Sequence, residues 1–146
     1  MVKVLLVEDN KLTRMATERL LIKSGCLVVS AKDGEEALPI ACQERPDVVL
    51  LDMMLPKLSG PEVLRGIKAN LETANVPVIV LTGLSQKNEA RLLEDGASAF
   101  VEKSAALDNP ELLLSVIRQV LRTAALAAEL HGLPATPATP SASISA

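Results

Sequence analysis

The sequence has 146 residues, 49% of them hydrophobic, so it can bury a sizeable core and is most simply one domain with some surplus. Lys and Arg number 15 against 18 Asp and Glu, and a net charge of -3 offers no electrostatic basis for binding nucleic acid or an anionic membrane. A single Phe, with no Trp or Tyr, excludes a stacking platform for single-stranded nucleic acid.

Cysteine usage and hydropathy indicate an intracellular protein. Cys26 and Cys42 lie in apolar surroundings without CxxC spacing, which is typical of reduced core thiols. The amino terminus enters an apolar run without a signal-peptide pattern, and no apolar run approaches the roughly 18 residues of a membrane helix. We therefore expect a soluble, cytoplasmic protein with no membrane partner.

Short apolar runs alternate with longer segments of helical period. Five strands are predicted, over Val2–Val7, Leu27–Ala31, Val48–Leu51, Val78–Leu81 and Ala99–Val101. Such alternation is typical of βαβ units, which build a doubly wound parallel sheet between two layers of helices. The predicted fold class is therefore α/β, with three layers in the order α/β/α.

Capping residues mark the first three helices. The first follows the first strand and ends at Ser24-Gly25, because Gly accepts the left-handed conformation there. The second opens at Asp33–Glu36, where acidic residues oppose the positive end of the helix dipole, and Pro39 is tolerated near its start. The third begins at Ser59–Glu62, with Ser or Gly at the cap and Pro at the first helical position.

The carboxyl-terminal part holds two further helices. Ser85 is expected to cap the fourth and Asp95-Gly96 to close it, whereas Asp108–Glu111 caps the last. Residues 124–130 can extend that last helix, and the Ala, Pro, Ser and Thr that follow predict a disordered tail or linker. We expect one domain over 1–123 and an extension over 124–146, which suits either a stand-alone domain or a piece of a longer protein.

Polar residues follow four of the predicted strands, at the edge where ligands bind in open α/β sheets. These residues are Glu8 and Asp9 after the first strand, Asp52 after the third, Thr82 after the fourth and Lys103 after the fifth. Each alone could cap a helix, end a strand or face solvent, but chance convergence of all of them is improbable. Crowded carboxylates either raise the pKa of at least one of them or demand a cation, and oxygen-only ligands favour Mg²⁺ or Mn²⁺. A Lys and a Thr beside that ion suit the oxygens of a phosphoryl group.

Four segments together resemble the receiver domain of bacterial two-component response regulators, over roughly Val2–Arg122. They are Val7–Asn10, Leu50–Pro56 with Gly60 behind it, Leu81–Gly83 and Gly96–Lys103. The resemblance implies a flavodoxin-like (βα)5 fold with strand order 2-1-3-4-5 and five helices. It also implies that Asp52 accepts a phosphoryl group from a histidine kinase or a histidine phosphotransfer protein.

Further roles follow from the same resemblance. Glu8, Asp9, Asp52 and the backbone carbonyl of Met54 would hold Mg²⁺, and Thr82 and Lys103 would contact the phosphoryl oxygens. Phe100 matches an aromatic switch that turns inward when Thr82 moves toward the phosphate. The surface of the fourth helix, fifth strand and fifth helix would then change its affinity for a downstream protein. Such a chain is no enzyme beyond its own phosphorylation and slow dephosphorylation.

The sequence departs from the family after Lys103, where Ser104 replaces the usual proline. A cis peptide bond is costly without proline, so the geometry of a rather long loop over Ala105–Pro110 is left open. Apolar Met54 and Leu84 flank the path expected for hydrolytic water, which suggests slow self-dephosphorylation.

Three alternatives share parts of this pattern. A phosphohydrolase of the haloacid dehalogenase type needs an acid two residues after its nucleophile, where this chain has Met54. A flavodoxin-like electron carrier needs phosphate-loop hydroxyls and ring-stacking aromatics that the sequence lacks. A degenerate receiver, acting as a phosphorylation-independent interaction module, is the main rival, and Ser104 is the feature that motivates it.

Overall fold

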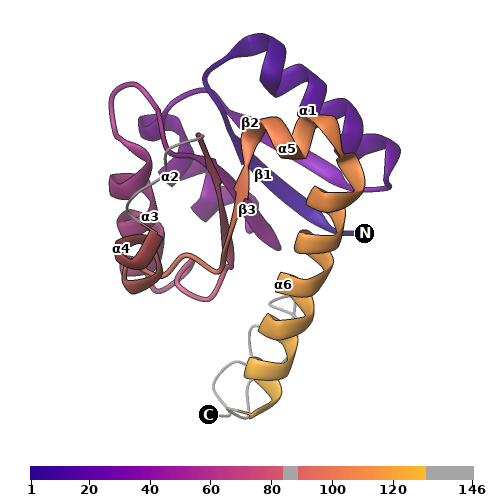
Figure 1. Ribbon diagram of the computed structural model, residues 1–146. Helices are drawn as coiled ribbons and strands as arrows, with labels where there is room; N and C mark the ends of the chain where they lie inside the picture. Colours follow the sequence, from indigo (N-terminus) through magenta and orange to yellow (C-terminus); the bar gives the residue numbers. More distant parts are fainter. Residues whose placement is uncertain (84–88, 131–146) are drawn as a thin grey trace.

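The computed structural model describes residues 1–83 and 89–130, with the backbone alone for residue 89. Five parallel strands form one sheet in the order β2-β1-β3-β4-β5, which confirms the predicted topology (Figure 1). The strands are β1 (Lys3–Val7), β2 (Leu27–Ala31), β3 (Val48–Asp52), β4 (Val78–Thr82) and β5 (Ala99–Glu102). The strand order reverses between β1 and β3, so their carboxyl ends flank the crevice where such sheets bind ligands.

Helices cover both faces of the sheet. Those described are α1 (Lys11–Lys23), α2 (Gly34–Glu44), α3 (Gly60–Ala69), α4 (Glu89–Glu94), α5 (Lys103–Asp108) and α6 (Pro110–Leu130). Figure 1 shows α2, α3 and α4 on one side and α1, α5 and α6 on the other, which is the predicted three-layer arrangement. In the described residues, no helix is long and apolar enough to cross a membrane.

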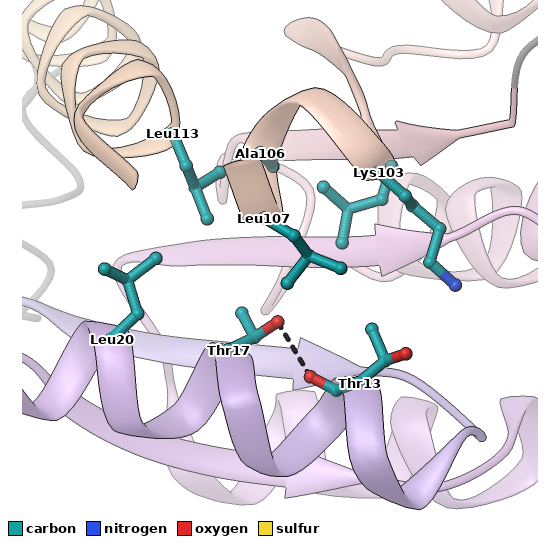
Figure 2. A pocket seen from close by; sticks show the side chains of 8 residues that line it. Thr13, Thr17, Leu20, Lys103, Ala106, Leu107 and Leu113 are labelled. Atoms are coloured by element: carbon teal, nitrogen blue, oxygen red, sulfur yellow. Dashed lines mark hydrogen bonds between the residues drawn. The ribbon is translucent and has the colours of Figure 1, made fainter. Parts of the chain in front are cut away.

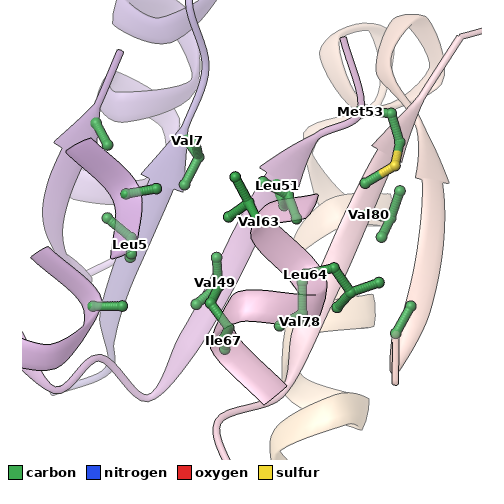
Figure 3. Packing of buried hydrophobic residues seen from close by; sticks show 14 of the residues in the cluster. Leu5, Val7, Val49, Leu51, Met53, Val63, Leu64, Ile67, Val78 and Val80 are labelled. Carbon is green, nitrogen blue, oxygen red and sulfur yellow. The ribbon is translucent and has the colours of Figure 1, made fainter. Parts of the chain in front are cut away.

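The core consists of two apolar layers separated by the sheet. All of β3 is buried; Val49 and Leu51 point into the layer under α2 and α3, and Val48 and Leu50 into the layer under α1 and α6. Figure 3 shows the first layer, where α3 packs across β3 and β4. Burial of each such Leu contributes roughly 1.5–3 kcal/mol, so the central strand that carries Asp52 is firmly held.

The predicted capping residues are confirmed at α2 and α3. Asp33 accepts the backbone N–H of Glu36 at 2.9 Å at the start of α2. At α3, Ser59 and Glu62 form a reciprocal capping box, with bonds of 3.2 and 3.3 Å. These bonds satisfy amide donors that a helix start leaves unpaired.

The prediction of five helices is wrong, because residues 103–108 form a helix where we expected a loop. All peptide bonds of the described residues are trans, including the one after Lys103. Without proline at position 104 the backbone continues into a helical turn, and Ala105 and Ala106 favour helix there. Ala106 is buried in the layer under α1 and α6, which anchors this extra helix.

The last helix continues past the sheet to Leu130 (Figure 1). Its buried residues, Leu113, Ile117 and Val120, lie in the half that packs on the sheet. The expected tail over 131–146, the expected cap at Ser85 and Leu84, expected beside the path of hydrolytic water, lie outside the described residues.

Candidate functional site

Three carboxylates meet at the carboxyl ends of β1 and β3. Glu8 and Asp9 follow β1 and Asp52 ends β3, and each offers an oxygen within 4.8 Å of the others. Glu8 is 1% exposed and Asp52 is 2% exposed, whereas Asp9 faces solvent. The structure therefore brings together the acidic residues that the sequence analysis selected.

Lys103 lies between two of these carboxylates. It is the first residue of α5, directly after β5, and its Nζ atom lies 2.8 Å from Glu8 Oε1 and 3.2 Å from Asp52 Oδ2. Although burial opposes the change, the carboxylates of Glu8 and Asp52 raise the pKa of Lys103 above its usual range. The ammonium is therefore a fixed positive charge in the site.

The pKa of Glu8 is raised, chiefly because the side chain is buried. The neighbouring Asp52 raises this pKa further, while Lys103 and a backbone bond from Asn10 oppose the change. Glu8 Oε2 accepts that Asn10 N–H at 3.1 Å, but no hydrogen bond of good geometry reaches Oε1, whose described partner is the Lys103 ammonium. A buried carboxylate oxygen without a hydrogen bond of good geometry is suited to bind a metal ion.

Two residues that sequence reasoning missed hold the acidic pair in place. Arg14 Nη1 donates to the backbone carbonyl of Glu8 at 2.9 Å and to that of Asp9 at 3.3 Å. Asn10 caps α1 by accepting the Thr13 N–H at 3.0 Å. The cap was recognisable as an Asn before a helical pattern, whereas no sequence signal pairs Arg14 with distant carbonyls.

The loop after Asp52 folds back on the same carboxylate. The Met54 N–H donates to Asp52 Oδ1 at 3.1 Å, and the Gly60 N–H closes the loop by donating to the Met53 carbonyl at 3.2 Å. The Met54 side chain is 80% exposed, so it lies at the surface beside the site. Oδ1 is thus bound to the loop, whereas Oδ2 faces Lys103.

Thr82 and Phe100 lie along the neighbouring strands. Thr82 ends β4 and is buried, and the β3–β4 register places it one residue beyond the partner of Asp52, which is Leu81. Phe100, in β5, pairs with Val80 of β4. It is half-buried and packs against the core layer under α2 and α3. Thr82 and Phe100 therefore lie on neighbouring strands, two register positions apart.

The cavity beside Lys103 is small. Its volume is about 10 Å³, and it lies between α1 and α5, where Leu107 faces Thr13 and Thr17 (Figure 2). That volume holds about one water molecule and leaves no room for a small-molecule substrate. Because Asp9 and Met54 are exposed at the same edge, the donor set is open to a group presented from outside.

The donor set fits a small divalent cation. Three carboxylate oxygens lie within reach of one centre, one of them buried and without a good hydrogen bond, and hard oxygen ligands are what Mg²⁺ selects. The adjacent ammonium adds a second charge suited to phosphoryl oxygens. The arrangement is therefore compatible with a divalent cation beside Asp52 and with a phosphoryl group facing Lys103.

Comparison with known proteins agrees with this geometry. A family model described as response regulator receiver domain matches residues 4–126. The polar-differentiation response regulator DivK of Brucella anthropi is 37% identical over 101 residues, which are 68% of this chain and 82% of that protein.

Solved structures show the same likeness. The chemotaxis protein CheY4 of Vibrio cholerae is 30% identical with a TM-score of 0.75, over 82% of this chain and 98% of that chain. The BeF3-activated receiver domain of Klebsiella pneumoniae RstA is 32% identical with a TM-score of 0.74, again over 82% and 98%. On this sequence match, fold and site, the chain belongs to the response regulator receiver domain family, the phosphorylation-dependent modules of two-component signalling.

Proposed function

We propose that Asp52 accepts a phosphoryl group from a phosphohistidine on a histidine kinase or a phosphotransfer protein. The supporting observation is the Asp52 carboxylate, which lies within 4.8 Å of two further carboxylates and 3.2 Å from the Lys103 ammonium. Two free cysteines and the family's signalling role support a cytoplasmic location. The chain would perform no chemistry beyond its own phosphorylation and dephosphorylation.

Glu8, Asp9, Asp52 and the Met54 carbonyl would hold Mg²⁺, and Mn²⁺ would suit the same oxygens. When bound, the ion neutralises negative charge on the phosphoryl group. The Met54 carbonyl is part of the proposal because the Met54 N–H already ties its loop to Asp52.

Asp52 acts as the nucleophile, and a carboxylate in this role needs no base to remove a proton. One carboxylate oxygen forms a bond to phosphorus while the phosphorus–nitrogen bond breaks, and the electron pair stays on the imidazole nitrogen of the donor. Lys103 and Thr82 contact the phosphoryl oxygens, the first as a charge and the second as a hydroxyl donor.

Phosphorylation would change the surface around Phe100. Movement of Thr82 toward the phosphate leaves room for the Phe100 ring to turn inward, which shifts the population of two conformations. The affected surface comprises α4, β5 and α6, the last being the fifth helix of the sequence prediction. Phe100 also lines a hollow of about 420 Å³ between β5 and α6, so its movement would reshape a surface open to a downstream protein.

The single Phe of the chain allows a direct test. Fluorophenylalanine incorporated at Phe100 gives one ¹⁹F resonance, which beryllofluoride with Mg²⁺ is expected to shift or split. The response should disappear in Asp52→Asn. An unchanged resonance at saturating beryllofluoride would instead support the degenerate receiver. The complete set of three acids, Thr82 and Lys103 argues against that alternative.

We predict slow hydrolysis of phospho-Asp52, because exposed apolar Met54 cannot orient an attacking water. Met54→Gln supplies an amide for that purpose and should shorten the half-life by about tenfold, a modest part of the usual effect of a positioned polar group. The half-life is measured from release of ³²P-phosphate in Mg²⁺ buffer. Leu71→Gln, at a position 94% exposed in the loop after α3, is the control. A wild-type half-life of seconds contradicts the prediction.

A further inference from the structure

We infer that Asp33, Gly34 and Lys57 position the loop after Asp52 and thereby set how tightly the metal site binds its ion. These residues and Leu58, which lies against Gly34, are called the α2 tether. The inference rests on the proposed metal site, because the loop carries Met54, whose carbonyl would be one of the ligands. None of the four residues is a ligand in that proposal.

An ion pair joins the tip of the loop to α2. Lys57 Nζ lies 3.5 Å from Asp33 Oδ2, and the Asp33 side chain is only 5% exposed. The other Asp33 oxygen accepts the Glu36 N–H, and this bond, aided by Lys57, lowers the pKa of Asp33 although burial opposes the change. Asp33 is therefore a fixed, ionised anchor rather than a mobile surface group.

Gly34 allows the loop backbone to lie directly on the start of α2. A Cβ atom at this position would lie 2.2 Å from the Leu58 carbonyl oxygen and 2.5 Å from Leu58 Cβ. The first of these is a backbone atom, so relief would require the loop itself to shift. The absence of a side chain at Gly34 thus sets the separation between the loop and α2.

The loop is held at both ends, and the proposed ligand lies between them. At its base the Gly60 N–H binds the Met53 carbonyl, and the Met54 N–H binds Asp52. At its tip Lys57 adopts a φ of 69°, a left-handed conformation that a non-Gly residue keeps only where its surroundings hold it. Release of the tip would leave the Met54 carbonyl held from one side only, by the Met54 N–H bond to Asp52.

An effect of the Lys57 charge and an effect of loop positioning predict opposite changes in metal affinity when Lys57 is replaced. Lys57 carries a positive charge on the loop that follows Asp52, so its removal by itself would favour cation binding slightly. If the α2 tether positions the loop, the same removal weakens binding. The direction of the change therefore separates the two explanations.

The test measures Mn²⁺ binding by the EPR signal of free Mn²⁺, since the chain has no Trp for fluorescence. Lys57→Met should raise the dissociation constant about threefold to tenfold, below the 10- to 100-fold cost of losing a direct partner of a metal ligand. Lys57→Arg should restore most of the affinity. Lys32→Met is the matched control, because Lys32 precedes Asp33 and its described ion pair is with Glu36 at 3.8 Å.

Equal or tighter binding in Lys57→Met than in Lys32→Met would overturn the inference. Gly34→Ala is a second variant, expected to weaken binding more than Lys57→Met, with circular dichroism to show that it is folded. If it is not folded, the Lys57 series decides alone. Wild-type binding that Asp52→Asn removes, with no effect of Lys57→Met, would refute the α2 tether and leave the proposed function standing. A wild-type chain that binds no Mn²⁺ would refute both.

Discussion

Replacement of Asp52 by Asn is expected to abolish phosphorylation of the chain. Asn has nearly the same size and keeps an oxygen near the Met54 N–H, but a neutral amide is a poor nucleophile and a poor ligand for Mg²⁺. The expected loss is on the order of 1,000-fold or more, equivalent to about 4 kcal/mol in the barrier. Incubation with acetyl phosphate and Mg²⁺, followed by intact mass spectrometry, measures the phosphorylated fraction.

The control for this variant is Asp108→Asn, which removes the same charge from an exposed residue at the end of α5. It should be phosphorylated at the wild-type rate. Asp52→Asn should also remain folded, because Lys103 keeps its ion pair with Glu8 at 2.8 Å. Wild-type phosphorylation of Asp52→Asn would show that another carboxylate, such as Asp9, is the acceptor.

The sequence was sufficient to predict the sheet and the place of the site. The five residues of β3 are all buried, so the strand is an uninterrupted apolar run with a carboxylate at its end. The three acids, Thr82 and Lys103 each follow or end a strand, and parallel strands bring those ends to one edge. β3, β4 and β5 are each one residue longer than predicted, so Asp52 and Thr82 belong to the strands. When a polar residue follows an apolar run, the sequence pattern does not show whether that residue still belongs to the strand.

Contacts between distant segments could not be predicted. Lys57 and Asp33 pair across two loops, and no periodicity links them. The Arg14 bonds to the carbonyls of Glu8 and Asp9 depend on the direction that α1 takes after β1, which one sequence does not specify. The α5 helix was missed for another reason. Its Ala residues favour helix, but Ser104 in place of the family's proline left the geometry of this segment open.

Replacement of Lys103 by Met is expected to destabilise the metal-free chain and to slow phosphorylation. The Lys103 ammonium faces Glu8 and Asp52, whose side chains are 1% and 3% exposed. In Lys103→Met, both carboxylates lose this neighbouring positive charge. Removal of one partner from a buried ion pair costs about 3–5 kcal/mol. We expect about 2–3 kcal/mol here, because Lys103 is 28% exposed and Glu8 can bind a proton.

The loss of stability in Lys103→Met should increase with pH. Burial and Asp52 raise the pKa of Glu8, and loss of the lysine removes the largest opposing cause. In the window between the ordinary carboxyl pKa and this raised value, the folded chain binds more protons than the unfolded chain. Stability therefore falls as pH rises through that window. The difference from wild type should be small at acidic pH and larger at neutral pH.

Mg²⁺ should reverse this loss, because a divalent ion would replace the missing positive charge between the carboxylates. The measurement is urea unfolding of wild type and Lys103→Met, followed by far-UV circular dichroism, with and without Mg²⁺ at acidic and neutral pH. Lys3→Met is the control. Its ammonium pairs with Glu44 at 2.9 Å, both side chains are at least 30% exposed, and the expected cost is about 0–1 kcal/mol without any dependence on Mg²⁺. A loss in Lys103→Met that Mg²⁺ leaves unchanged would mean that the three carboxylates do not form a metal site, because a bound cation must relieve the repulsion that the lysine relieves in its absence.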